Sequence, residues 1–442
     1  MPAATTEEAP PARRPLRRAL VGAFRSIIRL YFREIERIGA PPGADTQGRV
    51  FVSNHHNALI DPILVLTDAD CEISPIAKST LWKIPGLKWL LDGAGAVPLY
   101  RRKDDPGKDA AANDAIFARI ASHLAEGGNI LIFPEGTSHS EPQLAPLRSG
   151  AARMLIAAEP GQRTSAPLTY QAVALEFDAR DRFRSRCLVL WGPVRRLAEF
   201  SGSGEDRVRA ITAQMAADLG ELLVEGETHD DRMLVARVAE MLANDAGDAT
   251  LSGWSTIGRQ VELAARTLRE ADPETVARVR EKVDAYYREL DRLARRDAHI
   301  STTRTAPKPR TRWLGRAAIA PLAIPGFALY AIPYFIPRLV ARASDGDAVS
   351  TVKLGTALLV YPLWAAGLVG LSFALIPPPL SFVAATVVLA SPFAALRWLD
   401  AYWARAPERD ATADELAQLN RLRIAARTAI DEARARLTRP DR

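Results

Sequence analysis

Two stretches of the chain carry no charged residue, and their length limits what the chain can fold into. They are residues 317–337 and residues 354–396. A helix needs about 20 apolar residues to cross a bilayer, so the second stretch has room for two crossings. The prolines at positions 377–379 would separate them. The sequence therefore predicts a membrane region at residues 313–400.

The basic residues beside these stretches predict their topology. Positive residues mark the cytoplasmic ends of membrane segments. Here Lys353 and Arg397 lie at the two ends of the second stretch, and the proline turn carries no charge. We therefore expect a hairpin over 354–396 with both ends cytoplasmic, and a re-entrant or interfacial element over 317–337. Three full spans, or a hairpin buried in a soluble protein, are the alternatives.

Charge and cysteine content restrict the partners and cofactors that the chain can be expected to bind. The 442-residue chain has a formal charge of +6 and a pI near 9.4, which favours anionic partners such as phosphorylated metabolites or anionic membrane lipid. No helix-turn-helix, zinc-finger or aromatic RNA-binding pattern accompanies this charge, so nucleic acid is not an expected partner. Cys71 and Cys187 cannot form a disulfide framework, and no Cys/His cluster suggests a metal.

The run from Pro15 to Ile38 interleaves arginines with apolar residues at helical spacing. An amphipathic helix with arginines on one face suits the interface of a membrane. The alternative is a helix packed on the neighbouring domain. The run lacks the continuous apolar core and the cleavage site of a secretory signal.

Short apolar runs alternate with helical patterns from residue 49 to about residue 194, which predicts an α/β domain. The expected strands are VFVSN, GAVPLY, ILIFPE, YQAVALEF and CLVLWG, and the expected helices are DPILVLTD, NDAIFARIASHLAEGG and SGAARMLIAAE. The predicted organisation comprises an N-terminal amphipathic or interfacial helix (1–47), an α/β domain with a mixed sheet flanked by helices (48–200), a helical region (201–300), a linker (301–312), the membrane region (313–400) and a C-terminal amphipathic helix (401–442).

The stretch SNHHNALIDP places His55 and His56 shortly before Asp61, in a loop between an expected strand and an expected helix. An imidazole can accept a proton at neutral pH, and a carboxylate on its other nitrogen fixes its tautomer. No serine or cysteine lies in a nucleophile turn nearby, so such a histidine would act on a substrate hydroxyl directly. The structural alternative makes Asp61 a helix N-cap before Pro62 and the histidines polar loop residues.

Three later stretches supply anion-binding and turn residues. GAVPLYRR ends an expected strand with arginines, of which Arg101 suits a phosphate monoester. PLRSGAA brings Arg148 to the start of a helix, where backbone N–H groups also favour anions. FPEGTS supplies a carboxylate, a glycine turn and hydroxyl groups from Glu135, Gly136, Thr137 and Ser138.

Together and in this order, the motifs resemble the glycerophospholipid acyltransferase family, which includes lysophosphatidate acyltransferases. The resemblance covers about residues 30–195. FPEGTSHSEPQLAPLRSGAA and DARDRFRSRCLVLWGPV are similar to a bacterial branch akin to fungal glycerol-3-phosphate acyltransferases. Two positions differ from the family pattern. Ser138 replaces an arginine, which leaves phosphate binding to Arg101 and Arg148, and residues 173–175 (VAL) lack a proline of the fourth motif.

The resemblance implies a membrane-bound O-acyltransferase whose catalytic domain faces the cytoplasm. A histidine base, oriented by Asp61, would deprotonate a hydroxyl of glycerol 3-phosphate. The oxygen would then attack the thioester of acyl-CoA or acyl carrier protein. The resemblance implies no metal and no tightly bound cofactor. The substrate-binding residues that it implies are Arg101, Glu135, Gly136, Thr137, Ser138 and Arg148.

Three choices stay open at this stage. The common family spacing, with four residues between His and Asp, selects His56, whereas the spacing of the similar branch selects His55, which we favour. The acceptor could be 1-acylglycerol 3-phosphate in place of glycerol 3-phosphate. A different class of function is a non-catalytic lipid-binding protein on the same fold. That protein would be expected to have lost the His, Asp, Glu or Arg residues, and all of them are present.

Overall fold

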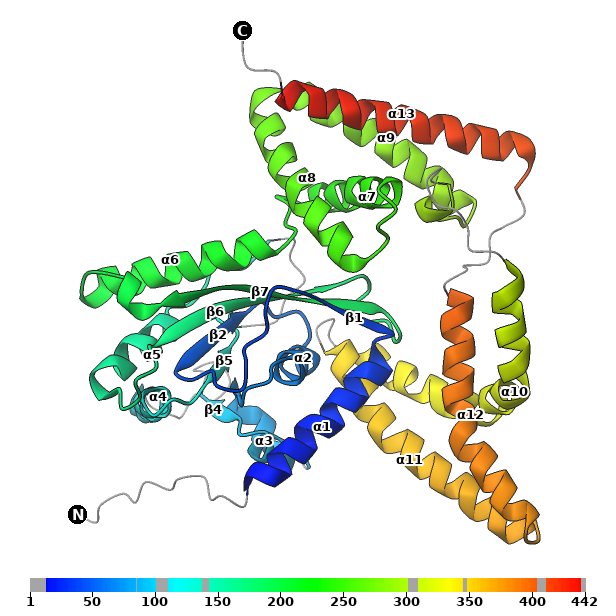
Figure 1. Cartoon of the computed structure of the whole chain (residues 1–442), viewed down its shortest axis with the longest axis horizontal. Helices are drawn as coiled ribbons and strands as arrows, with labels where there is room; N and C mark the ends of the chain where they lie inside the picture. Colours follow the sequence, from blue (N-terminus) through cyan, green and yellow to red (C-terminus); the bar gives the residue numbers. More distant parts are fainter. Residues whose placement is uncertain are drawn as a thin grey trace. The chain divides into compact units, whose positions relative to one another are not determined.

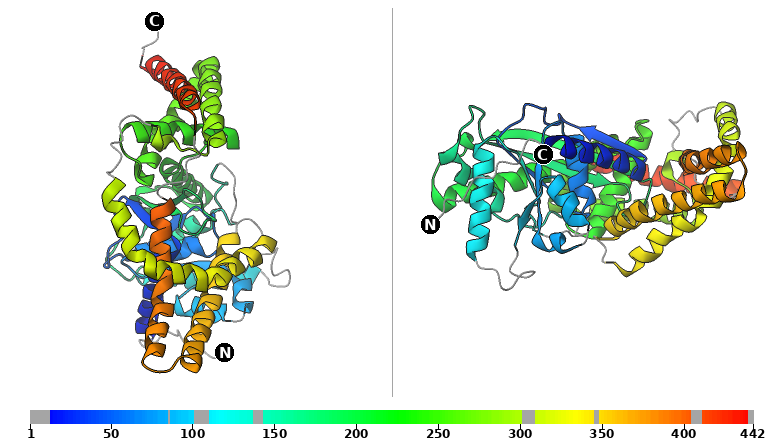
Figure 2. Two further views of the ribbon diagram at one scale, coloured as in Figure 1. Left: turned by 90° about the vertical axis from the view of Figure 1, so that its right-hand side faces the viewer. Right: turned by 90° about the horizontal axis from the view of Figure 1, so that it is seen from below.

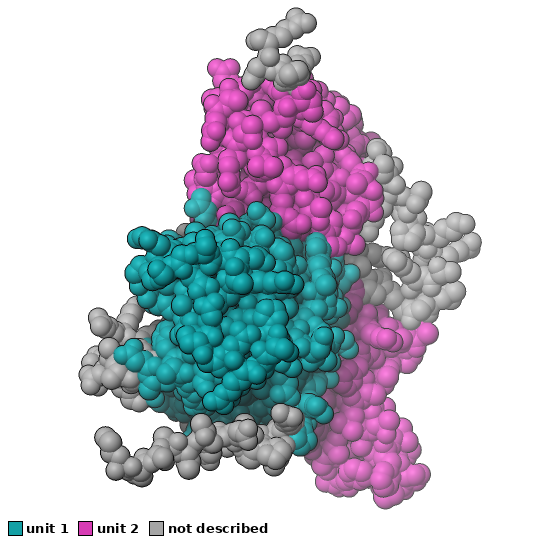
Figure 3. All heavy atoms as spheres, turned by 60° about the vertical axis from the view of Figure 1, so that its left-hand side comes forward, with its two compact units in different colours: residues 1–223 teal, residues 224–442 magenta. Residues whose placement is uncertain are grey.

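The computed structural model of the chain (Figures 1 and 2) describes residues 13–84, 86–100, 110–136, 143–300, 309–344, 348–403 and 411–438. The chain divides into two compact units, residues 1–223 and residues 224–442 (Figure 3).

Unit 1 is built on a mixed sheet, and its described residues form seven strands in the order β1-β7-β6-β2-β5-β3-β4. The strands are β1 (Glu34–Ile38), β2 (Arg49–Ser53), β3 (Ser74–Lys78), β4 (Val97–Leu99), β5 (Ile130–Ile132), β6 (Thr169–Phe177) and β7 (Arg186–Arg196). Neighbouring strands are parallel except for β6 and β7. In the centre, Val50 of β2 lies opposite Ile130 of β5 and Tyr170 of β6. The predicted fold class is confirmed.

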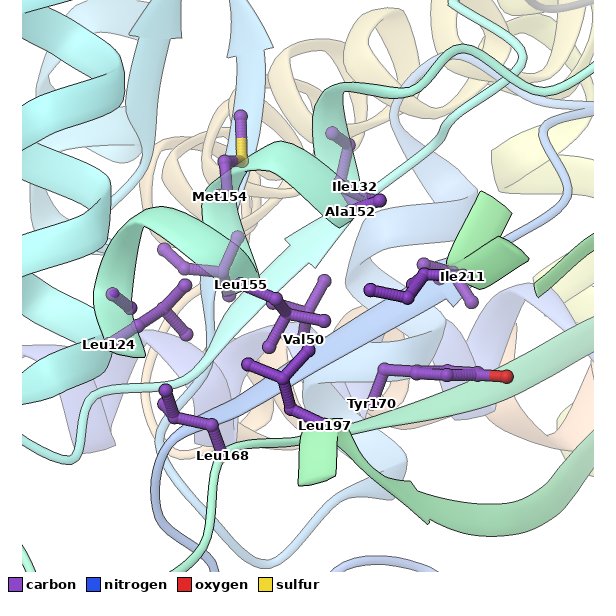
Figure 4. Close-up of a cluster of buried hydrophobic side chains, with 14 of the residues drawn as sticks. Val50, Leu124, Ile132, Ala152, Met154, Leu155, Leu168, Tyr170, Leu197 and Ile211 are labelled. Atoms are coloured by element: carbon purple, nitrogen blue, oxygen red, sulfur yellow. The ribbon is translucent and has the colours of Figure 1, made fainter. Parts of the chain in front are cut away.

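Helices cover both faces of this sheet (Figure 1). They are α1 (Arg13–Tyr31), α2 (Ile60–Asp68), α3 (Leu87–Gly93), α4 (Ala110–Ala125), α5 (Gly150–Ala158) and α6 (Gly204–Leu222), with short 3₁₀ turns at Ser79–Lys83, Glu159–Gly161 and Leu197–Glu199. Val50 and Val52 point into a core shared with α4, α5 and α6 (Figure 4). Phe51, between them, stacks edge-on against Trp191, whose indole donates to Asp68 at the end of α2. Alternating side chains of β2 therefore serve the two layers.

Helix α6 lies in the segment 201–300, which the sequence analysis treated as one helical region. Its apolar side chains, including Val208, Ile211 and Met215, are buried in the core that α6 shares with β2. The helix therefore belongs to unit 1.

The N-terminal run differs from the expected single helix. Helix α1 ends at Tyr31, and β1 follows as an edge strand that pairs in parallel with β7. The sequence of β1, EIERI, continues the mixed polar and apolar spacing of the helix, so the pattern alone concealed the break. Helix α1 packs on unit 1, with Ile28 buried and Arg25 donating to the carbonyl of Thr67 across 2.9 Å. Strand β3 was also not predicted.

Unit 2 begins with three helices, α7 (His229–Asp245), α8 (Leu251–Ala271) and α9 (Pro273–Arg292), and ends with α13 (Ala413–Leu437). Helix α9 has a capped start, because the Asp272 side chain accepts the backbone N–H of Thr275 and Pro273 occupies the first turn. The C-terminal helix, whose partner the sequence did not indicate, packs against α9 and shares its apolar core.

Between these elements lie α10 (Pro309–Val340), a 3₁₀ turn (Ala341–Ala343), α11 (Val349–Leu375) and α12 (Leu380–Trp403). Among the described residues, three helical segments are long and apolar enough to cross a membrane, and they cover 318–343, 349–375 and 380–400. Only 6% of the α11 window is buried within the protein. Most of the α11 surface is therefore not covered by other described residues.

Candidate active site

The paired imidazole and carboxylate lie in the loop between β2 and α2. His55 Nδ1 is 3.1 Å from Asp61 Oδ2, and the Asp61 side chain is completely buried. His55 contacts Asp61 through its imidazole ring. His56 donates its backbone N–H to the same Asp61 oxygen across 2.7 Å. Because Nδ1 faces the carboxylate, Nε2 is the nitrogen that can exchange a proton with a substrate.

The Asp61 carboxylate gathers several donors from the loop. Besides His55 and His56, the backbone N–H of Asn57 donates to Oδ2 across 2.6 Å, and the Asn57 side chain lies 3.4 Å from Oδ1. Helix α2 already begins at Ile60 with Leu59 as its N-cap, so Asp61 lies within the first turn. The alternative in which Asp61 serves as the N-cap is therefore wrong. Its carboxylate organises the histidine loop instead.

Two further residues, which were not among the predicted site residues, hold the histidine in place. The side chain of Asn54 donates to the carbonyl of Leu175 across 3.0 Å and accepts the Leu175 N–H across 2.8 Å. It therefore ties the end of β2 to β6. The ring of Phe133 stacks on the imidazole of His55, with centroids 4.1 Å apart. Both residues lie inside the quoted motifs, but their partners are distant in sequence and only the fold reveals them.

Glu135 connects the histidine loop to the segment that precedes α5. One carboxylate oxygen accepts the backbone N–H of His55 across 2.9 Å, and the other accepts the N–H of Ala145 across 3.1 Å. The side chain is almost completely buried. The FPEG turn and the histidine loop are therefore held together by one carboxylate.

Arg148 lies against the glycine of the same turn. The backbone N–H of Arg148 donates to the carbonyl of Pro134 across 2.8 Å. Gly136 has a φ of +76°, and a Cβ built there would be 2.5 Å from Arg148 Nε. The absence of a side chain at Gly136 thus leaves the space that the Arg148 guanidinium occupies, beside the turn that carries Glu135.

Three predicted site residues, Arg101, Thr137 and Ser138, lie outside the described residues. The other predicted site residues, His55, His56, Asp61, Glu135, Gly136 and Arg148, lie together in the structure. In the part of the chain that the structure describes, no group of three or more His, Cys, Asp or Glu side chains could hold a metal ion.

The cysteines are poor candidates for a nucleophile. Both are buried. Burial raises the pKa of Cys71 to about 11, and burial also raises the pKa of Cys187 well above its usual value. Neither thiol would be ionised at neutral pH, and the thiolate is the reactive form.

Residues 30–171 match the protein-family model Acyltransferase. This segment belongs to the acyltransferase family. The match contains the histidine–aspartate loop, the FPEG turn and Arg148, so the acyltransferase domain includes the whole described site. The family resemblance carried by the four motifs is thereby confirmed.

Curated relatives of the acyltransferase domain carry two kinds of name. Glycerol-3-phosphate O-acyltransferase 2 of Saccharomyces cerevisiae is 25% identical over 293 residues, which is 63% of this chain and 38% of that protein. A chloroplastic 1-acyl-sn-glycerol-3-phosphate acyltransferase of Brassica napus is 30% identical over 31% of this chain and 36% of that protein. A similar enzyme of Arabidopsis thaliana is 30% identical over 28% of this chain and 33% of that protein. The aligned part of the chain thus spans less than two fifths of the length of each relative.

A crystal structure of the 1-acyl-sn-glycerophosphate acyltransferase PlsC from Thermotoga maritima can also be superposed on the chain. The TM-score is 0.35 with 16% sequence identity, over 49% of this chain and 84% of that one.

Proposed function

We propose that the protein is a membrane-bound O-acyltransferase that transfers an acyl group from a thioester to a hydroxyl of glycerol 3-phosphate. The observation that carries the proposal is the His55–Asp61 pair, whose 3.1 Å contact leaves Nε2 as the base. It lies within a segment of the acyltransferase family.

In the proposed reaction, His55 Nε2 takes the proton of the acceptor hydroxyl as its oxygen attacks the thioester carbonyl. A C–O bond forms, the tetrahedral intermediate collapses, and the C–S bond breaks. The departing thiolate takes the proton back from the imidazolium. Asp61 stabilises that imidazolium through Nδ1, and the stacked Phe133 ring fixes the plane in which Nε2 points.

We assign Arg148 to the phosphate of the acceptor, with Arg101 as its partner. A guanidinium can donate two parallel hydrogen bonds to a phosphate. Arg148 is exposed beside Gly136, while Glu135 ties its segment to the loop of His55. The arrangement would hold the phosphate at a fixed distance from the base. Thr137 and Ser138 complete the proposed acceptor site.

The proposed donor is acyl-CoA or acyl carrier protein, and no tightly bound cofactor is required. The apolar helices α10, α11 and α12 would keep the protein at the membrane, where a long acyl chain and the lipid product partition. The basic residues at the ends of these helices support the proposal that the acyltransferase domain lies at the cytoplasmic face, by the positive-inside rule.

A second acceptor, 1-acylglycerol 3-phosphate, is favoured by the names of the two plant relatives. The test uses purified full-length protein in lipid, labelled acyl-CoA or acyl carrier protein, and a panel of acceptors with products separated by mass. Glycerol 3-phosphate should be acylated faster than 1-acylglycerol 3-phosphate, and unphosphorylated glycerol hardly at all. Turnover of the lysolipid alone would assign the second function. Binding of lipid with no transfer to any acceptor would instead indicate the non-catalytic protein.

A further inference from the structure

The last helix of the chain completes the core of the helices that precede the membrane region. Buried side chains of α7, α8, α9 and α13 form one apolar cluster, which includes Tyr286, Leu419 and Ala426. The chain leaves this cluster near Ile300 and re-enters it near Ala411. Helices α10, α11 and α12 therefore lie, in sequence, between two segments that form one helical core.

Buried ion pairs connect the same elements. Arg423 of α13 donates from Nε to Asp297 Oδ1 across 2.8 Å and from Nη2 to Asp245 Oδ1 across 2.5 Å. Asp297 is buried and also accepts from Tyr286, across 2.7 Å, and from Asn244. Removing one partner of such a network would leave a buried charge unpaired, which strongly destabilises a folded core. The helix α13 is thus an integral part of this core.

The packing of α13 on the helices that precede the membrane region limits how the chain can cross a bilayer. Residues 229–300 and 411–437 lie on the same side of a membrane, because they form one core. The chain between them must therefore cross an even number of times. The connection at 404–410 contains Arg405, Glu408, Arg409 and Asp410, which would be costly to bury in lipid, so it does not supply a crossing. Three apolar helices cannot all span.

Of the three apolar helices, α10 is the one that we infer to have both ends on the same side of the membrane. Basic residues flank both ends, with Arg312 and Arg316 before the apolar stretch and Arg338 and Arg342 after it. It contains four prolines, and it bends between its two arms (Figures 1 and 2). By contrast, the turn between α11 and α12 carries no charge.

Contacts of α10 with α11 and α12 indicate how far the bend of α10 would lie from the turn that joins those two helices. A Cβ built on Gly326 would be 2.2 Å from the Ser391 carbonyl oxygen, so α10 and α12 approach closely there. Trp364 of α11 donates to the carbonyl of Leu329 across 2.8 Å. Ser391 and Trp364 both lie about 16 Å along their helices from the turn, at about 1.5 Å per residue. That is near the middle of a hydrocarbon core of about 30 Å.

We propose that α11 and α12 cross the membrane as a hairpin, and that α10 is a re-entrant helix that enters and leaves the bilayer from the side of the helical core. The partner of its exposed apolar surface, which includes Ile332, Phe335 and Leu339, is the lipid of that leaflet. The inference rests on the membrane residence proposed above, and not on acyl transfer.

The test is labelling of single introduced cysteines by a membrane-impermeant maleimide, in intact and permeabilised host cells. The exposed positions are Glu274→Cys, Ala343→Cys, Pro377→Cys and Thr438→Cys, and wild type gives the background of its two buried cysteines. Pro377→Cys alone should be labelled in intact cells, and the other three only after permeabilisation. Labelling of Ala343→Cys from outside would mean that α10 crosses. Protection of Pro377→Cys in intact cells would exclude the hairpin. Either result overturns the proposal.

A cross-link tests the closed core in the membrane. Arg278 of α9 lies 3.8 Å from Glu432 of α13, so a short bifunctional maleimide should join Arg278→Cys to Glu432→Cys in native membranes. The matched control pairs Arg278→Cys with Gln418→Cys. Gln418 lies on α13, as Glu432 does, but about 21 Å away along the helix. Absence of the first cross-link, with both sites labelled singly, would remove the same-side constraint. The readout needs no enzyme activity, so it fails separately from the proposed function.

Discussion

Arg148 and Gly136 occupy adjoining space, and a single methyl group at Gly136 would collide with the guanidinium. The Cβ would lie 2.5 Å from Nε and 2.8 Å from Cζ of Arg148. The backbone of Gly136, with φ of +76°, also disfavours any residue with a side chain. The glycine of the FPEG turn can therefore be tested as part of the proposed phosphate site.

We expect Gly136→Ala to raise the KM for the phosphorylated acceptor, because the methyl group displaces Arg148. Arg148→Ala should raise it further, by roughly 10- to 100-fold, which corresponds to losing a charge-assisted contact of about 1.5–3 kcal/mol. The KM for acyl-CoA should change little in both variants. Steady-state kinetics with each substrate varied in turn provide the measurement.

The control is Gly247→Ala, because Gly247 has the same φ of +76° but no atom within 4 Å of the built Cβ. It should carry the backbone strain without the kinetic effect. If Arg148→Ala weakens acyl-CoA and acceptor equally, the arginine serves the structure or the phosphates of CoA instead.

The histidine pair gives a prediction with opposite outcomes at neighbouring positions. His55→Ala should lower kcat by at least about 100-fold, in line with loss of a general base. His56→Ala should be milder, because the contact of His56 with Asp61 that the structure shows is through its backbone N–H. Rate measurements on folded, membrane-bound variants decide between them. A result in which His56→Ala abolishes turnover and His55→Ala spares it would reassign the base.

Asp61→Asn tests the carboxylate. An amide can accept the backbone N–H groups of His56 and Asn57, but it cannot stabilise an imidazolium as a carboxylate does. We expect a severe loss of kcat with little change in either KM. Turnover close to wild type would show that Asp61 serves only to shape the loop.

Asn54 should affect kcat by holding the histidine loop in position. Asn54→Ala removes both hydrogen bonds to Leu175 and leaves two buried backbone groups unpaired, which costs about 1–3 kcal/mol per group. We expect a lower melting temperature and a kcat reduced by roughly tenfold, since small displacements of a catalytic group are costly, with both KM values nearly unchanged. Asn54→Asp keeps the acceptor but turns a carboxylate oxygen toward the Leu175 carbonyl at a buried position, so it should not recover the stability. An unchanged kcat in a destabilised Asn54→Ala would limit the residue to a structural role.

Membrane residence predicts that full-length protein stays in the pellet after an alkaline carbonate wash, which releases peripheral proteins. The reason is the apolar surface of α10, α11 and α12, most of which is not covered by the protein. Full-length protein in the soluble fraction without detergent would contradict the proposal.

Sequence patterns predicted those features that depend on local periodicity. The strands around Val50, Ile130 and Tyr170 are short apolar runs between helical patterns, and the family motifs fall at their ends. Strand β1 escaped prediction because an edge strand needs few apolar residues, so EIERI resembles a continuation of α1.

The long-range contacts of the site could not be predicted in the same way. His55 and Asp61 are near in sequence, whereas the Asn54–Leu175 clamp joins residues 121 apart. The Glu135 carboxylate likewise meets the His55 N–H only because β2 and β5 are neighbours in the sheet. Pairing of distant strands sets these contacts, and a one-dimensional pattern holds no register between strands.

The buried carboxylate of Asp218 on α6 gives a prediction about stability and pH. Burial alone would raise its pKa, but hydrogen bonds from Arg195, Gln214 and Tyr170 hold the pKa below its ordinary value. A carboxyl group with a depressed pKa in the folded state stabilises the protein above its unfolded pKa of about 3.9, and the contribution is lost as the pH falls through the folded value.

Asp218→Asn should therefore destabilise unit 1 by about 1.5–3 kcal/mol at pH 7, from the loss of charge-assisted hydrogen bonds. That corresponds to a melting temperature lower by roughly 3–12 °C. The gap between variant and wild type should stay constant from pH 8 to about pH 5 and narrow below about pH 4. Asp206→Asn on the same helix is the matched control, because Asp206 is exposed and its pair with Arg209 is worth little. Thermal melting of the protein in detergent across this pH range provides the measurement. A gap that instead widens on acidification would show that the Asp218 carboxylate is not held ionised by its partners.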